Sequence, residues 1–234
     1  MCARNPGTAL ERKPTDGEFT EVTGTSAVPS EHMAEDNSSA LPPLFDPLSK
    51  TNLARSVEGA LLRQVPSKLA ALPRFLGAGI YAIYYTGPLD IYASISSEEC
   101  LTPIYVGKAE PAGGRKGLTS ATGGTPLWSR LADHAKSVGQ AMNLDDLDFR
   151  CRYLVADDLF TPLAEQLMIR EYQPVWNVAL DGFGNHDPGA GRRNQARSPW
   201  DVVHPGRPWA ELQPDPGPDA LALHLERVRV HLNQ

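Results

Sequence analysis

Two β-rich runs that lie close together in the chain constrain its fold most strongly. Gly79–Tyr85 reads GIYAIYY and Ile104–Lys108 reads IYVGK, so β-branched and aromatic residues dominate both. This composition, with turn residues around each run, predicts strands. Asp148–Val155 and Ile91–Ile95 are predicted to be two further strands. The chain is therefore expected to contain a small sheet.

Helix signals follow and precede these strands. Thr125-Pro126 predicts the start of a helix that runs to about Val138, and Thr161-Pro162 predicts another that runs to about Tyr172. Pro174 lies just beyond the second helix, where it cannot continue it. Apolar periodicity predicts further helices over about Lys50–Gln64, Ser67–Leu72 and Pro218–His231. The intervening segment 181–217 is rich in Gly, Pro and Arg and is expected to be an ordered, packed loop, since it contains Trp200 and Trp209.

Length and composition restrict the class of protein. The chain has 234 residues, of which 41% are hydrophobic, enough for one domain with attachments or a small pair of domains. No stretch approaches the ~20 apolar residues that cross a bilayer, and the first thirty residues lack a secretory signal. Cys2, Cys100 and Cys151 are odd in number and far apart, which argues against a disulfide framework or a zinc cluster. We therefore expect a protein of the reducing cytoplasm, with no membrane partner.

Charge is distributed unevenly. The net charge of −6 and the pI of about 5.5 argue against unspecific nucleic-acid binding. Much of the acid lies in the first fifty residues, whereas acids and bases balance between Ile104 and Trp200. A local basic surface is therefore compatible with the acidic whole. Residues 1–47 have no apolar periodicity and are predicted to form a disordered acidic leader.

Two tyrosines on the predicted strands are candidates for chemistry. Tyr81 is either a core residue or a general base, and as a base it needs a pKa below its ordinary value near 10. Lys108, Arg130 or a divalent metal could lower that pKa by favouring the phenolate. Strand alternation places Tyr105 and Gly107 on one face, either as packing and turn residues or as part of a site.

The predicted helices carry the remaining candidates. Arg130 and His134 are one turn apart and flank an apolar stripe, where an arginine can bind a phosphate through paired donors, although both could be ordinary surface residues. Glu165 precedes Met168 and Ile169 on an apolar stripe, so its carboxylate requires a cation or a basic partner such as Arg130. Asn177, which follows Pro174, is predicted from the residues alone to be a turn residue.

Taken together, the ordered set Gly79-Ile80-Tyr81, Tyr105-Val106-Gly107, Arg130/His134, Glu165 and Asn177 resembles the GIY-YIG nuclease superfamily over roughly residues 77–180. The resemblance implies an α+β fold with a small antiparallel β-sheet flanked by helices and with DNA-binding insertions. It also implies a catalytic set: Tyr81, Tyr105, Lys108, Arg130, His134, Glu165 and Asn177. In the family the equivalent glutamate binds one Mg²⁺, for which Mn²⁺ can substitute. His134 is left open as a proton donor or a positioning group.

The chain looks most similar to the restriction endonucleases of this superfamily that cut GC-rich palindromes. The runs GFGNHDPG at 182–189 and WDVVHPGR at 200–207 support this, because similar runs follow the core in that branch. The resemblance then implies a homodimer acting on double-stranded DNA and a cognate DNA methyltransferase in the same system. Insertions and loops supply the expected DNA-binding residues: Arg115, Lys116, Arg192, Arg193, Asn194, Gln195 and Arg197.

The expected organisation is a leader at 1–47, a helical segment at 48–76, a nuclease core at 77–180, and a DNA-contacting loop region with a C-terminal helix at 181–234. Two alternatives stay open within the same fold. One is a structure-selective repair or mobile-element nuclease. The other is an inactive DNA-binding module.

Overall fold

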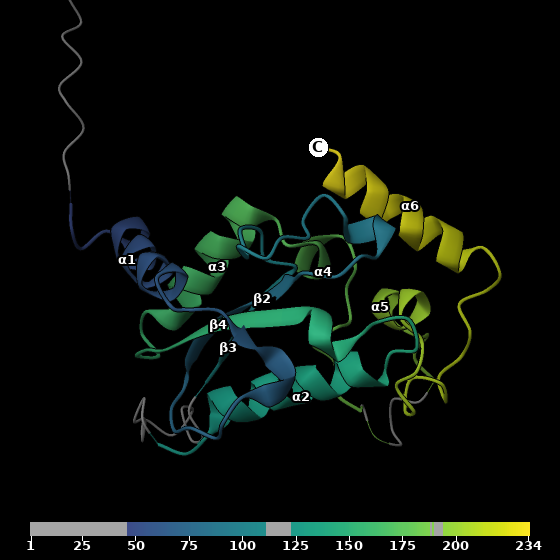
Figure 1. Ribbon diagram of the computed structural model, residues 1–234, viewed down its shortest axis with the longest axis horizontal. Coiled ribbons are helices and arrows are strands. Elements are labelled where there is room, and N and C mark those ends of the chain that lie inside the picture. Colours follow the sequence, from purple (N-terminus) through teal and green to yellow (C-terminus); the bar gives the residue numbers. More distant parts are fainter. Residues whose placement is uncertain (1–45, 111–122, 188, 190–193) are drawn as a thin grey trace, which may run out of the picture. The chain divides into compact units, whose positions relative to one another are not determined.

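The fold is centred on one antiparallel sheet. A computed structural model describes residues 46–110, 123–187, 189 and 194–234 (Figure 1). The strands are arranged in the order β1-β4-β2-β3, and every neighbouring pair is antiparallel. Their bounds are β1 Ser67–Lys68, β2 Gly79–Tyr85, β3 Tyr105–Ala109 and β4 Phe149–Val155.

Strand β2 is an inner strand of the sheet, with β3 on one side and β4 on the other. All seven of its residues are buried, as expected for a strand covered on both faces. The register places Tyr81 opposite Gly107 of β3 and Tyr153 of β4. This pairing brings the two tyrosine blocks of the sequence side by side.

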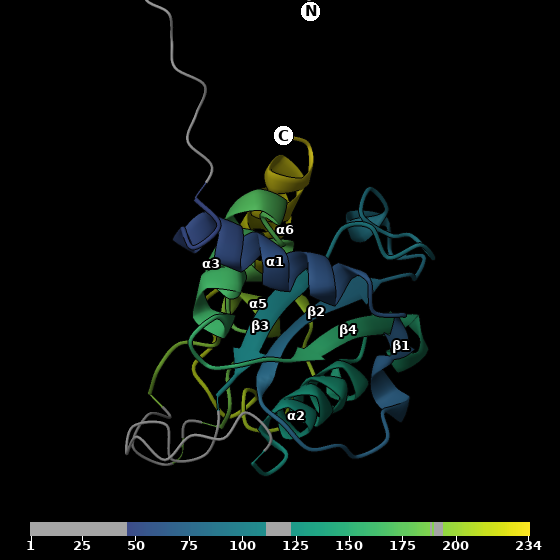
Figure 2. The same ribbon diagram turned by 90° about the vertical axis from the view of Figure 1, so that its left-hand side faces the viewer.

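Helices cover the two faces of the sheet (Figure 2). On one face, α1 (Lys50–Leu62) and α3 (Thr161–Tyr172) pack over Ile80, Ala82 and Tyr84 of β2. On the other face, α2 (Pro126–Gln140) packs over the alternate residues of β2, among them Tyr81. The period of two along the strand thus sends Tyr81 toward α2.

The C-terminal part of the described chain extends the core on the Tyr81 face. It contains α4 (Val175–Val178), α5 (Pro199–Val203) and α6 (Ala220–Leu232). Trp176 and Trp200 are buried and meet edge to face, with ring centroids 5.6 Å apart. The predicted packed loop is therefore ordered around Trp200, and it contains a short helix that the sequence did not predict.

Most of the predicted elements are confirmed, and the expected α+β architecture is observed. The predicted strand at Ile91–Ile95 is wrong: a 3₁₀ turn, Asp90–Tyr92, replaces it. Both edges of β2 are already paired with strands. The backbone amides of Tyr92 and Ala93 donate instead to the carbonyl oxygens of Leu89 and Asp90, three residues earlier. The predicted helix at Ser67–Leu72 is also wrong in its first part, because Ser67 and Lys68 pair with the free edge of β4 before a 3₁₀ turn at 69–71.

Part of the predicted organisation lies outside the described residues. This applies to residues 1–45 of the predicted leader and to Arg115, Lys116, Arg192 and Arg193 of the predicted DNA-binding set. In the remaining chain, which the structure does describe, none of the helices combines the length and the apolar character needed to cross a membrane.

Candidate active site

The site is built around the ring of Tyr81, which lies against the backbone of Gly107. A Cβ atom placed on Gly107 would be 2.4 Å from the Tyr81 hydroxyl oxygen and 3.0 Å from Cε1 of Tyr105. No side chain fits there without displacing a tyrosine. The glycine of the second tyrosine block is therefore required by the close approach of the first block.

Tyr81 forms a hydrogen bond with His134 inside the core. The hydroxyl oxygen lies 2.6 Å from Nε2 of His134, and both side chains are buried. Burial raises the pKa of Tyr81 well above 10, and the nearby Tyr105 raises it further, whereas Arg130 opposes this shift. Burial also lowers the pKa of His134 well below 6.5, with Arg130 acting in the same direction. The phenol is therefore protonated and the imidazole neutral, and the hydroxyl group donates to Nε2 in the tautomer that carries the imidazole proton on Nδ1.

The expectation that nearby cations lower the pKa of Tyr81 is thus only partly met. Arg130 acts in that direction, but desolvation of the phenolate is the larger effect. Nε2 of the neutral His134 can accept the proton of the Tyr81 hydroxyl group, which the Arg130 cation cannot do. His134 is held in place by stacking on Phe183, with ring centroids 4.5 Å apart and planes 17° apart.

Tyr105 lies next to this pair at the edge of the sheet. Its ring is 5.2 Å from His134 and 6.2 Å from Tyr81 between centroids. Burial raises the pKa of Tyr105, while Arg130 lowers it. A Cβ atom on Gly184 would be 2.8 Å from the Tyr105 hydroxyl oxygen and 3.0 Å from NH2 of Arg130. The second tyrosine and the arginine therefore meet over the backbone of the 182–187 turn.

Arg130 projects from α2 toward that turn. Its NH2 donates to the carbonyl oxygen of Gly184 at 2.8 Å, and its NH1 donates to Nε2 of His186. The guanidinium is thus fixed in direction while it stays charged at any ordinary pH. A fixed, partly buried guanidinium is suited to binding a phosphate and to stabilising negative charge that develops on it.

Glu165 and Lys108 form an ion pair near the two tyrosines. The Lys108 Nζ lies 3.3 Å from Oε2 of Glu165 and 3.4 Å from Oε1 of Glu110. Burial raises the pKa of Glu165, whereas Lys108 lowers it. The partner of Glu165 is therefore Lys108, not the Arg130 that the sequence suggested. Glu165 also raises the pKa of Tyr81, which places the carboxylate within electrostatic range of the phenol.

The Glu165 carboxylate fits a hard divalent ion. It is a half-buried carboxylate, with 20% of its side chain exposed, so it keeps access to solvent while it needs a cation. A magnesium ion typically takes one or two carboxylates and completes its shell with waters and phosphate oxygens. Among the described residues no group of three or more His, Cys, Asp or Glu side chains is arranged to hold a metal. A metal at Glu165 would accordingly depend on waters and substrate oxygens for its other ligands.

Asn177 supports the site from behind β3. Its Oδ1 accepts from the amide of Val106 at 2.8 Å, and its Nδ2 donates to the carbonyl oxygen of Val106, also at 2.8 Å. The side chain thereby pairs with the open edge of β3, as a neighbouring strand would. Because Val106 lies between Tyr105 and Gly107, this contact fixes the second tyrosine block. Asn177 is thus placed where it can support the site, and its role in catalysis stays a prediction.

Arg207 is a residue of this region that the sequence did not single out. It is buried between Trp200 and Trp209, with its guanidinium carbon 4.5 and 4.6 Å from the two ring centroids. Its Nε and NH2 both donate to the Asp201 carboxylate at 2.6 Å. Further bonds from the guanidinium reach the carbonyl oxygens of residues 182, 183 and 185. Arg207 therefore clamps the turn that binds Arg130.

Comparison with protein families agrees with this geometry. The family described as the Eco29kI GIY-YIG domain matches residues 73–231, more than half of the chain. The chain belongs to this family. No curated protein matches it significantly. The protein is therefore one of a family of DNA endonucleases, which generally use a divalent metal ion.

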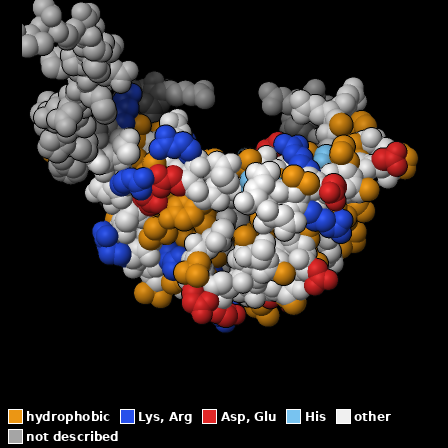
Figure 3. All heavy atoms as spheres, turned by 90° about the horizontal axis from the view of Figure 1, so that it is seen from above, with side chains coloured by type: hydrophobic (Ala, Val, Ile, Leu, Met, Phe, Trp, Pro, Cys, Tyr) orange, Lys and Arg blue, Asp and Glu red, His pale blue; other side chains and the backbone are white. Residues whose placement is uncertain are grey.

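The family match extends beyond the core into the segment with the remaining DNA-binding predictions. Asn194 and Gln195 are exposed at the surface of this Eco29kI-type domain. Arg197 differs, because its NH2 pairs with Glu211 at 3.3 Å and only 18% of its side chain is exposed. A DNA contact from Arg197 would have to compete with that ion pair. On the face seen in Figure 3, basic and acidic side chains are interspersed.

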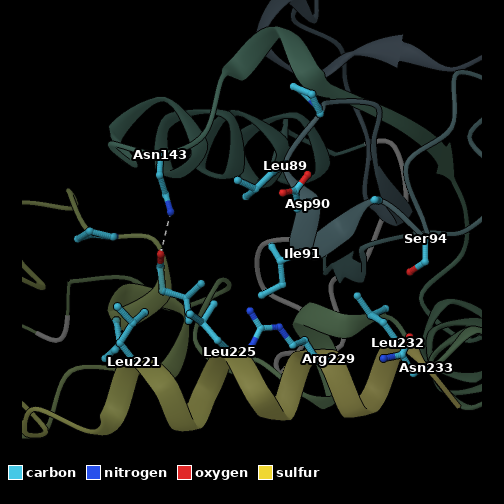
Figure 4. A pocket seen from close by; sticks show the side chains of 15 residues that line it. Leu89, Asp90, Ile91, Ser94, Asn143, Leu221, Leu225, Arg229, Leu232 and Asn233 are labelled. Carbon is cyan, nitrogen blue, oxygen red and sulfur yellow. Dashed lines mark hydrogen bonds between the residues drawn. The ribbon is translucent and has the colours of Figure 1, made fainter.

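One cavity of the Eco29kI-type domain lies away from the candidate catalytic cluster, which is formed by Tyr81, Tyr105, Arg130, His134 and Glu165. The cavity has a volume of about 870 Å³ and lies between α6 and the turn at residues 88–94. In Figure 4, Leu225 and Arg229 of α6 face Leu89 and Ile91 across it. None of the predicted catalytic residues lines it.

Proposed function

We propose that this protein is a type II restriction endonuclease that hydrolyses double-stranded DNA at a GC-rich palindrome with one Mg²⁺ per active site. The observation that carries the proposal is the buried Tyr81–His134 hydrogen bond beside Arg130 and Glu165. A proton acceptor, a fixed cation and a carboxylate at one place are what hydrolysis of a phosphodiester requires. The length of the family match supports the restriction branch.

Tyr81 accepts the proton of the attacking water in this proposal. Its own proton passes at the same time to Nε2 of His134, which the 2.6 Å hydrogen bond prepares. The phenol then need not exist as a free phenolate, which its burial disfavours. His134 thus receives the role of a transient acceptor of the proton, since burial lowers the pKa of its imidazolium well below 6.5, and Phe183 holds its ring.

Arg130 binds the scissile phosphate and stabilises the additional negative charge of the pentacovalent state. Tyr105, on the same side of the turn, orients the water or the phosphate through its hydroxyl group. Lys108 contributes a second positive charge at the mouth of the site. Glu165 would hold the Mg²⁺, which when bound polarises the phosphate and stabilises the leaving oxygen.

A palindromic target requires two copies of this site related by a two-fold axis, so the active species is proposed to be a homodimer. Its host would need a cognate methyltransferase for protection of its own sites. Sedimentation of the purified protein with and without a palindromic duplex tests the dimer. A single protomer on a palindromic duplex would contradict it.

Digestion of a plasmid of known sequence tests the proposed activity. Wild-type protein with Mg²⁺ is expected to give discrete fragments whose ends map to one GC-rich palindrome, and EDTA is expected to abolish cutting. Glu165→Gln should be inactive, whereas Glu171→Gln is the matched control. Glu171 lies on the same helix, but its carboxylate pairs with Arg55 at 2.6 Å, away from the site.

Other outcomes identify the alternatives. Cutting only at flaps or lesions would replace the proposal by a repair or mobile-element nuclease. Metal-independent DNA binding without any cleavage would indicate an inactive module. Wild-type cutting by Glu165→Gln would overturn the metal-binding role of this carboxylate.

A further inference from the structure

A second, polar pocket lies directly beside the catalytic cluster. It has a volume of about 420 Å³ and is lined by the 184–187 turn together with Gln195, Trp209 and Gln213. The same turn binds Arg130 through Gly184 and His186. The pocket is therefore separated from the proposed phosphate site by the backbone of one turn.

The lining of this pocket is unsuited to a phosphate. Among the described residues that line it there is no lysine or arginine, and Asp187 adds a carboxylate. A phosphodiester placed there would meet the like charge of Asp187 without a lysine or arginine from the described lining residues to compensate it. The polar groups are instead those that interact with uncharged donors and acceptors, such as the edges of nucleobases.

Gln213 indicates which kind of group the pocket accepts. Its side chain is buried, with 8% exposure, and its Oε1 has no hydrogen-bond partner in the described part of the chain. An unpaired buried acceptor is unfavourable, and a donor from a ligand would remove that cost. Together with the Asp187 carboxylate, it makes the pocket short of donors. An exocyclic amino group supplies such a donor.

We propose that this pocket recognises the N4 amino group of a cytosine in the target next to the scissile phosphate, with Asp187 and Gln213 as the acceptors. The inference rests on the proposed function, which supplies the GC-rich duplex. A carboxylate that accepts from cytosine N4 is an established form of major-groove recognition. It also explains an acidic side chain so close to a DNA-cutting site, where a general phosphate contact would disfavour it.

The position of the pocket connects recognition to catalysis. A base bound between Asp187 and Gln213 would restrain the 184–187 turn from one side. Arg130 contacts that turn from the other side, and Arg207 fixes its start. Recognition of the correct base would therefore hold the guanidinium where the phosphate needs it. A wrong base would leave the turn, and hence Arg130, less well fixed.

A binding selection tests this proposal independently of cleavage. Wild-type protein is incubated with a randomised duplex library in Ca²⁺, and the bound sequences are determined. Asp187→Asn is tested in parallel, since an asparagine oxygen can keep the turn bond from the Gly189 amide, at 2.8 Å. Asp215→Asn is the matched control, because Asp215 accepts in the same way from the Gly217 amide at 2.9 Å and does not line the pocket.

Wild type is expected to select a cytosine at a position adjacent to the cut. Asp187→Asn should relax that position alone, by about 5- to 150-fold, and Gln213→Leu should relax the same position. Asp215→Asn should select as wild type does. Equal weakening of all sequences by Asp187→Asn, selection of adenine there, or no selection by wild type would each overturn the inference. Failure of cleavage with intact selection would instead refute only the proposed activity.

Discussion

Replacement of Tyr81 by phenylalanine separates the chemistry of the phenol from its contribution to stability. The substitution removes one hydroxyl group from a fully buried ring and leaves Nε2 of His134 without its 2.6 Å partner. Loss of such a buried hydrogen bond is expected to lower the free energy of unfolding by about 1–3 kcal/mol. Loss of a general base is expected to reduce the cleavage rate by about 10²- to 10⁴-fold.

The chain contains a matched control for this experiment. Tyr92 is equally buried, and its hydroxyl oxygen lies 2.7 Å from Nε2 of His204, a histidine outside the predicted catalytic set. Tyr92→Phe removes the same group from the same kind of tyrosine–histidine pair. It also deprives Trp176 Nε1 of an acceptor at 2.9 Å, so its effect on stability should be at least as large.

The assay is single-turnover cleavage of a duplex that carries the mapped site, with urea unfolding measured on the same preparations. Tyr81→Phe should lose both stability and cleavage, whereas Tyr92→Phe should lose stability alone. If the two variants cut DNA at similar rates, the phenol of Tyr81 has no part in the chemistry. The account of proton transfer to His134 would then be refuted.

Three further predictions follow from the same contacts. Gly107→Ala should fold but cut DNA at least tenfold more slowly in single-turnover assays. The added Cβ would lie only 2.4 Å from the Tyr81 hydroxyl oxygen and would displace it. Unchanged cleavage would contradict the tight packing. The free energy of unfolding should fall below pH 6.5 by up to about 1.4 kcal/mol per pH unit for each of His134 and His204. Burial lowers the folded-state pKa of both residues, that of His204 to about 3, so below pH 6.5 the unfolded chain binds protons that the folded chain excludes. A flat urea-unfolding profile between pH 7 and 5 would be inconsistent with two neutral buried imidazoles. Arg207→Met leaves the buried Asp201 carboxylate without its ion-pair partner, so the free energy of unfolding in urea should fall by about 3–5 kcal/mol. A fall of under about 1 kcal/mol would show that the clamp is dispensable.

Local sequence signals predicted the elements that depend on local physics. The β-rich run at Gly79–Tyr85 is a strand with those bounds, and the Thr161-Pro162 pair opens a helix that ends at Tyr172. The predicted strand at Ile91–Ile95 is replaced by a 3₁₀ turn, in which the amides of Tyr92 and Ala93 donate to carbonyl oxygens three residues earlier in the chain. Sequence composition alone does not show that β3 and β4 occupy both edges of β2.

For the candidate site, the sequence and its resemblance to the GIY-YIG nucleases indicated candidate residues but not the contacts among them. Strand alternation and helical spacing indicated Tyr105, Arg130 and Glu165 as candidates. The partners of these residues are set by contacts across long separations, such as the hydrogen bond from Tyr81 to a histidine 53 residues away. The same is true of Arg207, whose spacing from Asp201 gives no sign that it clamps the turn beneath Arg130.

The most direct test is the structure of Glu165→Gln bound to an uncleaved duplex containing its mapped site. The account predicts that the scissile phosphate lies within hydrogen-bonding distance of the Arg130 guanidinium, with the Tyr81 hydroxyl oxygen directed at a water opposite the leaving oxygen. A scissile phosphate bound elsewhere on the protein, out of reach of both side chains, would contradict it.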